Sequence, residues 1–211
     1  MEIVCIDKID STHLFMCKKA RKGDIDKPFA LYALEQTGGV GSRDNSWQSQ
    51  RGNLHLSFCL KRENLAPDLP LSSLSIYFAF LFKEVLVANG SCVWLKYPND
   101  LYLDDKKIGG VMSAKINDFI IISTGINAKF APFGAATLDI NVDLADLVDK
   151  FAKEIEKNLS WKEIFSKYMV EFQKSKNYSF HYDGKEVPLD SVLLCDDGSI
   201  LFQSKRIYSL R

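Results

Sequence analysis

The chain has 211 residues, 46% of them hydrophobic, which is enough for one well-packed core and a small appendage. Lysine plus arginine balances aspartate plus glutamate at 27 each, so no overall field attracts the protein to nucleic acid or to an anionic membrane. The start, MEIVCIDKID, carries no secretion signal, and the five cysteines show no CxxC spacing. We therefore expect a cytoplasmic protein with reduced thiols, and neither a nucleic acid nor a membrane partner. The three histidines suggest no metal site, and we assign no metal ligands.

The first half of the chain predicts strands separated by two helices. Asp10 or Ser11 caps a helix that runs to about Lys22, where Gly23 ends it. A second helix, at residues 71–88, is apolar around nearly its whole circumference, which is typical of a helix buried against a sheet. Its charged pair, Lys83 and Glu84, argues against a membrane span. Strands are expected at residues 2–7, 31–36, 53–61, 93–96, 101–103, 108–115 and 119–125.

Consecutive short strands with tight turns indicate an antiparallel or mixed sheet, so the predicted fold class is α+β. Two amphipathic helices follow at about residues 142–158 and 160–174. From residue 178 the pattern switches to period two, with turns at Asp183–Gly184 and Asp197–Gly198 that predict a small β appendage. We therefore expect a main domain at residues 1–175 and an appendage at residues 176–211.

The stretch Gln36 to Ser57, QTGGVGSRDNSWQSQRGNLHLS, joins two strands and has no periodicity of its own. Loops this long inside a compact domain usually close over ligands or are disordered. Its glycines let main-chain N–H groups approach an anion, Arg43 supplies a cation, and Trp47 would need a packing partner. A site for a phosphate or carboxylate is one interpretation, and a mobile hairpin loop is the other.

A second group of candidates lies in LKYPNDLYLDDKKIGG, at residues 95–110. Pro98 makes a rigid corner that presents Lys96 and Asp100 from neighbouring strand ends. Gly109 and Gly110 would weaken a strand unless something must approach the backbone closely, and Lys107 precedes them. The alternative is an ordinary turn followed by a charged hairpin. The strand end Thr124 to Asn127, TGIN, is a weaker third signal.

Taken together, these strings resemble the biotin protein ligases, which attach biotin to the carrier domain of acetyl-CoA carboxylase. The resemblance covers residues 1–175 and implies the class II aminoacyl-tRNA synthetase-like fold of biotin and lipoate ligases, with the tail as a shortened SH3-like domain. Many members also carry an N-terminal helix-turn-helix domain; because the catalytic pattern starts within ten residues of Met1, we expect none in this protein. The strings are IDSTH (9–13), QTGGVGSRDNSW (36–47), GNLHLS (52–57), KYPNDLYLDDKKIGG (96–110) and TGIN (124–127).

The resemblance implies a reaction in two halves. Biotin's carboxylate attacks the α-phosphate of MgATP to give biotinyl-AMP and pyrophosphate, and a lysine of the biotin carboxyl carrier protein then attacks the mixed anhydride. ATP, Mg²⁺ and biotin would be substrates and ions, with no tightly bound prosthetic group. The oligomeric state would be a monomer or a weak homodimer.

The implied site residues fall into three groups. The catalytic candidates are Lys107, as the cation beside carboxylate and α-phosphate, with Arg43 and Asp100, and Asp100 is also a candidate acceptor for the carrier lysine's proton. The implied biotin contacts are Ser11, Thr12, Gln36, Gly39, Gly41, Ser42, Lys107 and Gly110. The implied ATP contacts are Arg43, Trp47, Lys96, Asn99, Asp100, Lys107 and Asn127.

The sequence departs from the family pattern in the glycine loop, which commonly reads GRGRxxRxW. Its three arginine positions are here Val40, Ser42 and Asn45, so we expect Arg43 to neutralise the phosphate of the intermediate. His13 and Tyr97 stand where the family commonly has asparagine and tryptophan.

Two rival functions remain. Lipoate ligases and lipoyl or octanoyl transferases share the fold, but they call for a glycine run with a histidine–aspartate pair before GN, where this chain has Arg51. A non-catalytic biotin- or nucleotide-binding module would have lost its charged residues, whereas Lys107 and Asp100 are present.

Overall fold

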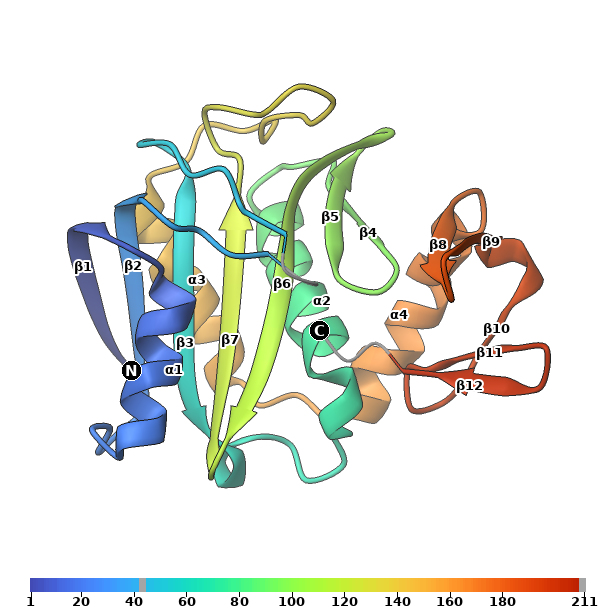
Figure 1. Ribbon diagram of the computed structural model, residues 1–211, viewed down its shortest axis with the longest axis horizontal. Coiled ribbons are helices and arrows are strands. Elements are labelled where there is room, and N and C mark those ends of the chain that lie inside the picture. Colours follow the sequence, from blue (N-terminus) through green and yellow to red (C-terminus); the bar gives the residue numbers. More distant parts are fainter. Residues whose placement is uncertain (42–44, 209–211) are drawn as a thin grey trace.

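A seven-stranded sheet organises the computed structural model, which describes residues 1–41 and 45–208 (Figure 1). The strand order is β1-β2-β3-β7-β6-β5-β4. Only β1 and β2 run parallel, and every other neighbouring pair in this sheet is antiparallel, so the prediction of a mixed sheet is confirmed. The strands are β1 (Glu2–Ile9), β2 (Phe29–Gln36), β3 (Leu54–Lys61), β4 (Trp94–Lys96), β5 (Asp100–Leu103), β6 (Lys106–Ile116) and β7 (Phe119–Ile126).

Helix α1 (Thr12–Lys22) lies alone on one face of the sheet, in front of it in Figure 1. Its ends are those the sequence predicts. The Ser11 side chain accepts a hydrogen bond from the backbone N–H of Leu14, and Gly23 takes a left-handed conformation at φ 75°. The opposite face is covered by α2 (Leu74–Ala88), α3 (Leu144–Glu156) and α4 (Trp161–Ser175).

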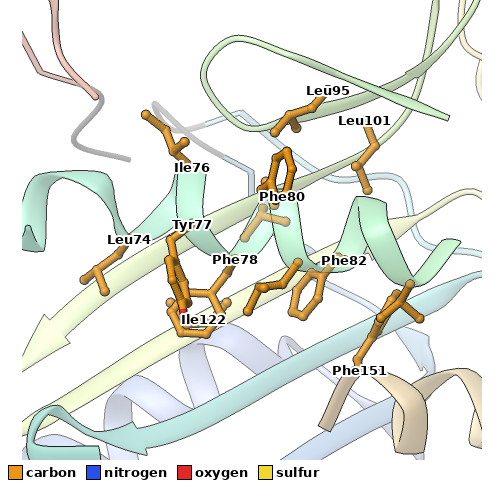
Figure 2. Close-up of a cluster of buried hydrophobic side chains, with 14 of the residues drawn as sticks. Leu74, Ile76, Tyr77, Phe78, Phe80, Phe82, Leu95, Leu101, Ile122 and Phe151 are labelled. Carbon is orange, nitrogen blue, oxygen red and sulfur yellow. The ribbon is translucent and has the colours of Figure 1, made fainter. Parts of the chain in front are cut away.

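The main core lies between the sheet and α2. Figure 2 shows Phe78 and Phe82 of this helix among buried side chains from the sheet and from α3. The rings of Phe82 and Phe151 have centroids 4.5 Å apart. Within the described chain, Leu71–Ala88 is the one helical segment whose length and hydropathy would allow a membrane span, and most of it is buried in this core. Its first turn is a 3₁₀ helix (Leu71–Ser73), so α2 starts three residues later than predicted.

The C-terminal appendage consists of two small sheets, and both predicted Asp-Gly turns connect paired strands. It packs onto the start of α4: the indole N–H of Trp161, the first residue of this helix, donates to the carbonyl of Asp196 at 2.8 Å. Phe180, Leu189 and Ile200 join the main core. The elements are β8 (Ser179–Tyr182), β9 (Lys185–Pro188), β10 (Leu193–Leu194), β11 (Ile200–Phe202) and β12 (Lys205–Ile207), and 3₁₀ turns lie at Arg62–Asn64 and Leu189–Ser191.

Candidate active site

The face of the sheet beneath α1 changes from apolar to polar along β3 and β7. Because these strands are antiparallel, Cys59 pairs with Ile121, Ser57 with Ser123, and His55 with Gly125. The first pair belongs to the apolar cluster under α1, while Ser57 and His55 are almost completely buried polar residues. Buried polar side chains need partners. This end of the face therefore has the character of a site rather than of a core.

A hollow opens at the polar end of this face. The loop between β2 and β3 crosses the sheet here toward β6 (Figure 1). The hollow brings together nine residues that the sequence predicts for the site: Ser11, Thr12, Gln36, Gly41, Trp47, Asn99, Asp100, Lys107 and Gly110. It is also lined by Thr124 and Gly125 of the TGIN string, and by residues that the sequence analysis did not assign to the site: His13, Val40, His55, Leu56, Val111, Met112 and Ser123. The alternation in GNLHLS, where polar residues recur every second position of a strand, was the available signal for His55 and Ser57.

A second hollow adjoins the first and shares Gly41, Trp47 and Lys107 with it. Its other walls come from the far side of the glycine loop and from the segment after β7. Asn127 ties that segment down, because its backbone N–H donates to the carbonyl of Ile108 and its carbonyl accepts from Leu138, both at 2.7 Å. The remaining lining residues are Asn45, Ser46, Gln48, Asn127, Pro132 and Ala135.

Thr12 and Gln36 meet at the first turn of α1. The backbone N–H of Thr12, which has no partner inside the helix, donates to Oε1 of Gln36 at 2.8 Å. The Thr12 hydroxyl donates to the same oxygen at 3.1 Å. Two donors thus fix the orientation of the Gln36 amide, whose nitrogen faces away from the helix.

The indole of Trp47 packs against β7 at Gly125. A Cβ atom at Gly125 would stand 2.5 Å from Cε2 of the indole, so only glycine allows this contact. Gly125 is therefore the packing partner that we expected for Trp47 from the sequence. Trp47 closes over β7 and forms a wall of both hollows.

Lys107 and Asp100 form an ion pair, with Nζ 2.7 Å from Oδ1. Both side chains are partly exposed, at 39% and 21%, and both line the first hollow. A Cβ at Gly110 would lie 3.0 Å from that carboxylate oxygen, and one at Gly109 would lie 2.6 Å from the carbonyl of Gly125. The glycine pair thus permits close strand approach and leaves room for the ion pair. Strand β6 begins at Lys106, so Lys107 lies within the strand and not before it as predicted.

Five buried side-chain polar atoms have no hydrogen-bond partner among residues 1–41 and 45–208. Four of them belong to residues that line the two hollows: Trp47 Nε1, His55 Nδ1, Asn99 Oδ1 and Asn127 Oδ1. Burial lowers the pKa of both His13 and His55, and the charge of Arg21 adds to this effect at His13. Both imidazoles are therefore neutral at neutral pH. Unpaired buried polar atoms are costly, and among the described residues they concentrate around the two hollows, which marks this region as the candidate site.

Two of the described site candidates, Lys96 and Gly39, fall outside the two linings. The ammonium of Lys96 lies over the rings of Tyr102 and Tyr178, 5.1 and 5.0 Å from their centroids, and so faces the appendage. Gly39 instead packs against the carbonyl of Trp47. Ser42 and Arg43 lie outside the described residues.

The described residues contain no group of three or more His, Cys, Asp or Glu side chains that could hold a metal ion. Among the described lining residues of the two hollows, Asp100 is the one with a carboxylate. Such a donor set suits a metal ion that arrives already bound to phosphates, as Mg²⁺ commonly does.

Comparison with known proteins places this geometry in a family context. Residues 5–127 match the model of the biotin/lipoate A/B protein ligase family. The bifunctional ligase/repressor BirA of Salmonella typhimurium is 30% identical over 197 residues, covering 83% of this chain and 60% of that protein. For BirA of Escherichia coli the identity is 34% over 132 residues, covering 59% and 40%. The chain thus spans 60% or less of the length of these two relatives.

Two solved structures agree with the fold. Biotin acetyl-CoA carboxylase synthetase of Helicobacter pylori, solved with bound biotinylated ATP, is 37% identical with a TM-score of 0.92, covering 99% of this chain and all of that one. Biotin protein ligase of Aquifex aeolicus, in complex with biotin and ATP, is 23% identical with a TM-score of 0.78, covering 100% and 96%, and shares the fold. The family model covers more than half of the residues here, so the chain belongs to the biotin/lipoate A/B protein ligase family.

Proposed function

We propose that this protein activates biotin with ATP and transfers it to a specific lysine of the biotin carboxyl carrier protein of acetyl-CoA carboxylase. The observation that carries the proposal is the pair of adjoining hollows, which share Lys107. Their lining residues also carry four of the five unpaired buried polar atoms found in residues 1–41 and 45–208. Biotin would occupy the first hollow and the nucleotide the second. The ligands named for the Helicobacter pylori and Aquifex aeolicus proteins support this assignment.

Biotin's ureido group would lie at the first turn of α1. The Ser11 hydroxyl oxygen accepts from Leu14, which leaves its proton for the ligand. Oε1 of Gln36 is already occupied by Thr12, so Gln36 would offer its second N–H. A cyclic urea has both acceptor and donor atoms, and it suits a pocket that offers hydroxyl and amide partners.

Lys107 would act between the two anions, since it borders both hollows. The carboxylate oxygen of biotin attacks the α-phosphorus, pyrophosphate leaves, and the carrier's amine later attacks the acyl carbon and expels AMP. Neither half needs a nucleophile from the enzyme. The chain supplies orientation and a fixed cation in a site where water is scarce. Asp100, adjacent to Lys107, is our candidate acceptor for the proton of the incoming lysine.

The nucleotide would lie against Trp47 and Asn127 in the second hollow, with Mg²⁺ held mainly by its phosphates. Asn99, which the resemblance also assigns to the nucleotide, lines the first hollow and would contact it from that side. Arg43 is proposed as the loop cation for the intermediate's phosphate, from the sequence alone. Lys96 stays a sequence-based candidate, and its position over Tyr102 and Tyr178 favours a role near the appendage.

The remaining assignments follow from the same activity. We place the catalytic domain at residues 1–175 and the C-terminal unit at residues 176–211, and we propose a cytoplasmic location. The zero formal net charge gives no reason to propose DNA binding.

Pyrophosphate release from ATP tests the proposal, measured with biotin, lipoate or octanoate as the acid. We expect release with biotin and then biotin transfer to the carrier protein. Release with lipoate or octanoate but not biotin would assign the chain to another branch of the family. Tight binding of biotin or ATP without any release would identify a binding module.

A further inference from the structure

A continuous chain of hydrogen bonds connects α1 with the glycine loop. From Thr12 it runs in one direction to Ser57 at 2.9 Å, to Ser123 at 2.7 Å and to Nδ1 of His13 at 2.8 Å. In the other direction, Gln36 Nε2 lies 3.1 Å from Oγ of Ser49. The Ser49 hydroxyl in turn lies 3.4 Å from the carbonyl of Trp47.

The polarity of the whole chain follows from the backbone N–H of Thr12, which can only donate. This N–H needs an acceptor, so the oxygen of the Gln36 amide, Oε1, faces Thr12. The amide nitrogen of Gln36, which is a donor, therefore faces Ser49. Because the single Thr12 proton goes to Gln36, Ser57 donates to Thr12 and Ser123 donates to Ser57. Nδ1 of His13 must then carry the proton that Ser123 accepts.

Ser49 therefore accepts from Gln36 and has its own proton free for the carbonyl of Trp47. The same corner is held by the N–H of Trp47, which donates to the carbonyl of Gly39 at 2.8 Å. There is no spare room, since a Cβ at Gly39 would lie 2.7 Å from Oγ of Ser49 and 3.0 Å from Nε2 of Gln36. The Ser49 hydroxyl thus joins the amide of Gln36 to the backbone of Trp47.

We propose that Ser49 is a positioning residue that couples the Gln36 amide to the placement of Trp47, and so links the biotin-ring pocket to the wall that both hollows share. The inference rests on the proposed function. A ligand bound to Gln36 stabilises the amide orientation that holds Ser49, and Ser49 holds the wall shared by both hollows. Loss of the hydroxyl should weaken retention of biotin and of biotinyl-AMP together.

The test compares Ser49→Ala, Ser49→Thr and the wild type in biotin-dependent pyrophosphate release and in the rate at which biotinyl-AMP escapes into solution. We expect Ser49→Ala to raise KM for biotin and the escape rate about tenfold each, as suits the loss of two linked hydrogen bonds. Ser49→Thr keeps the hydroxyl and should restore most of both. Gln50→Ala is the matched control, because its side chain is exposed and takes no part in the chain of hydrogen bonds.

A double-mutant cycle with Gln36→Leu separates coupling from a structural role. If Ser49 acts through Gln36, Gln36→Leu combined with Ser49→Ala should have the same KM for biotin as Gln36→Leu alone. Strictly additive losses, or wild-type values for Ser49→Ala, would overturn the inference while leaving the function intact. Should Ser49→Ala not fold, Ser49→Cys, a weak hydrogen-bonding group of similar size, makes the same comparison. No release by the wild type with biotin would overturn the function itself.

Discussion

The two faces of β3 and β7 differ in chemistry although both are buried. Toward α2, these strands present Leu56, Phe58 and Ile122 to the main aromatic core. Toward α1, the alternate positions are His55, Ser57 and Ser123, which are 1%, 0% and 6% exposed. Burial alone therefore does not distinguish the face that stabilises the fold from the face that carries the site.

The difference shows how one sheet can serve two purposes. Apolar side chains on the α2 face stabilise the folded state in proportion to the apolar area that they bury. Polar side chains on the α1 face gain little from burial and must be satisfied by hydrogen bonds, which here run from His13 to Trp47. Substitutions on the α2 face should change stability, and those around the polar end of the α1 face should change ligand handling. Four substitutions test this division.

The largest effect is expected in the α2 core, from Phe82→Ala. Phe82 is fully buried and contacts the rings of Phe58, Phe78 and Phe151. The lost packing and the resulting cavity should cost about 3–5 kcal/mol, and thermal melting should show a Tm lower by roughly 6–20 °C. KM values measured well below the new Tm should equal those of the wild type. Val170→Ala, at a position 73% exposed, is the control and should leave the Tm nearly unchanged.

Lys107→Gln, in contrast to Phe82→Ala, should lower activity and leave the stability of the protein nearly unchanged. Removing a cation needed as charge develops should slow pyrophosphate release by on the order of a hundredfold. The Tm should change little, because the ion pair with Asp100 is partly exposed. The neighbouring Lys106 is exposed, and Lys106→Gln should behave as wild type. Equal rates for the two variants would show that the cation acts from elsewhere.

Gly125→Ala tests the contact between the loop and the polar end of the sheet. The new methyl group would lie 2.5 Å from the indole, so Trp47 must move. We expect KM for both biotin and ATP to rise about tenfold, since displacing one wall disturbs both hollows. Unchanged KM values would place the indole elsewhere in the working enzyme.

His13→Asn should have the smallest effect and should appear only as a change in pH dependence. Burial and Arg21 lower the pKa of His13, so below pH 6.5 the unfolded chain binds a proton that the native protein excludes. The contribution of His13 to the stability of the folded protein is therefore fully present above pH 6.5. It is lost as the pH falls from 6.5 through the lowered pKa of His13 in the native protein. Asparagine can still donate to Ser123 but does not titrate, so the Tm difference between pH 7.5 and pH 5 should shrink. If the Tm difference between pH 7.5 and pH 5 were the same in His13→Asn and in the wild type, the native protein would take up a proton on His13 as readily as the unfolded chain does.

Local sequence determined most of the elements and their ends. Ser11 and Ser160 cap helices because their hydroxyls satisfy N–H groups that have no partner in the first turn. The Asp-Gly pairs make turns, and the Gly109–Gly110 pair lies inside a strand where the chain is approached closely, as its composition implied. These signals are local, since they depend on neighbours within a few positions along the chain.

Which side chains enter the site was decided by the tertiary structure. Lys96 and Lys107 belong to one sequence string, yet Lys107 borders both hollows and Lys96 lies over Tyr102 and Tyr178. Their directions depend on strand pairing, including a register shift between Leu101 and Tyr102 where β5 pairs with β6. In the same way, His55 meets Gly125 only because β3 pairs with a strand about 70 residues later. A composition pattern carries no information about such a register, because the contacts that set it are distant in sequence.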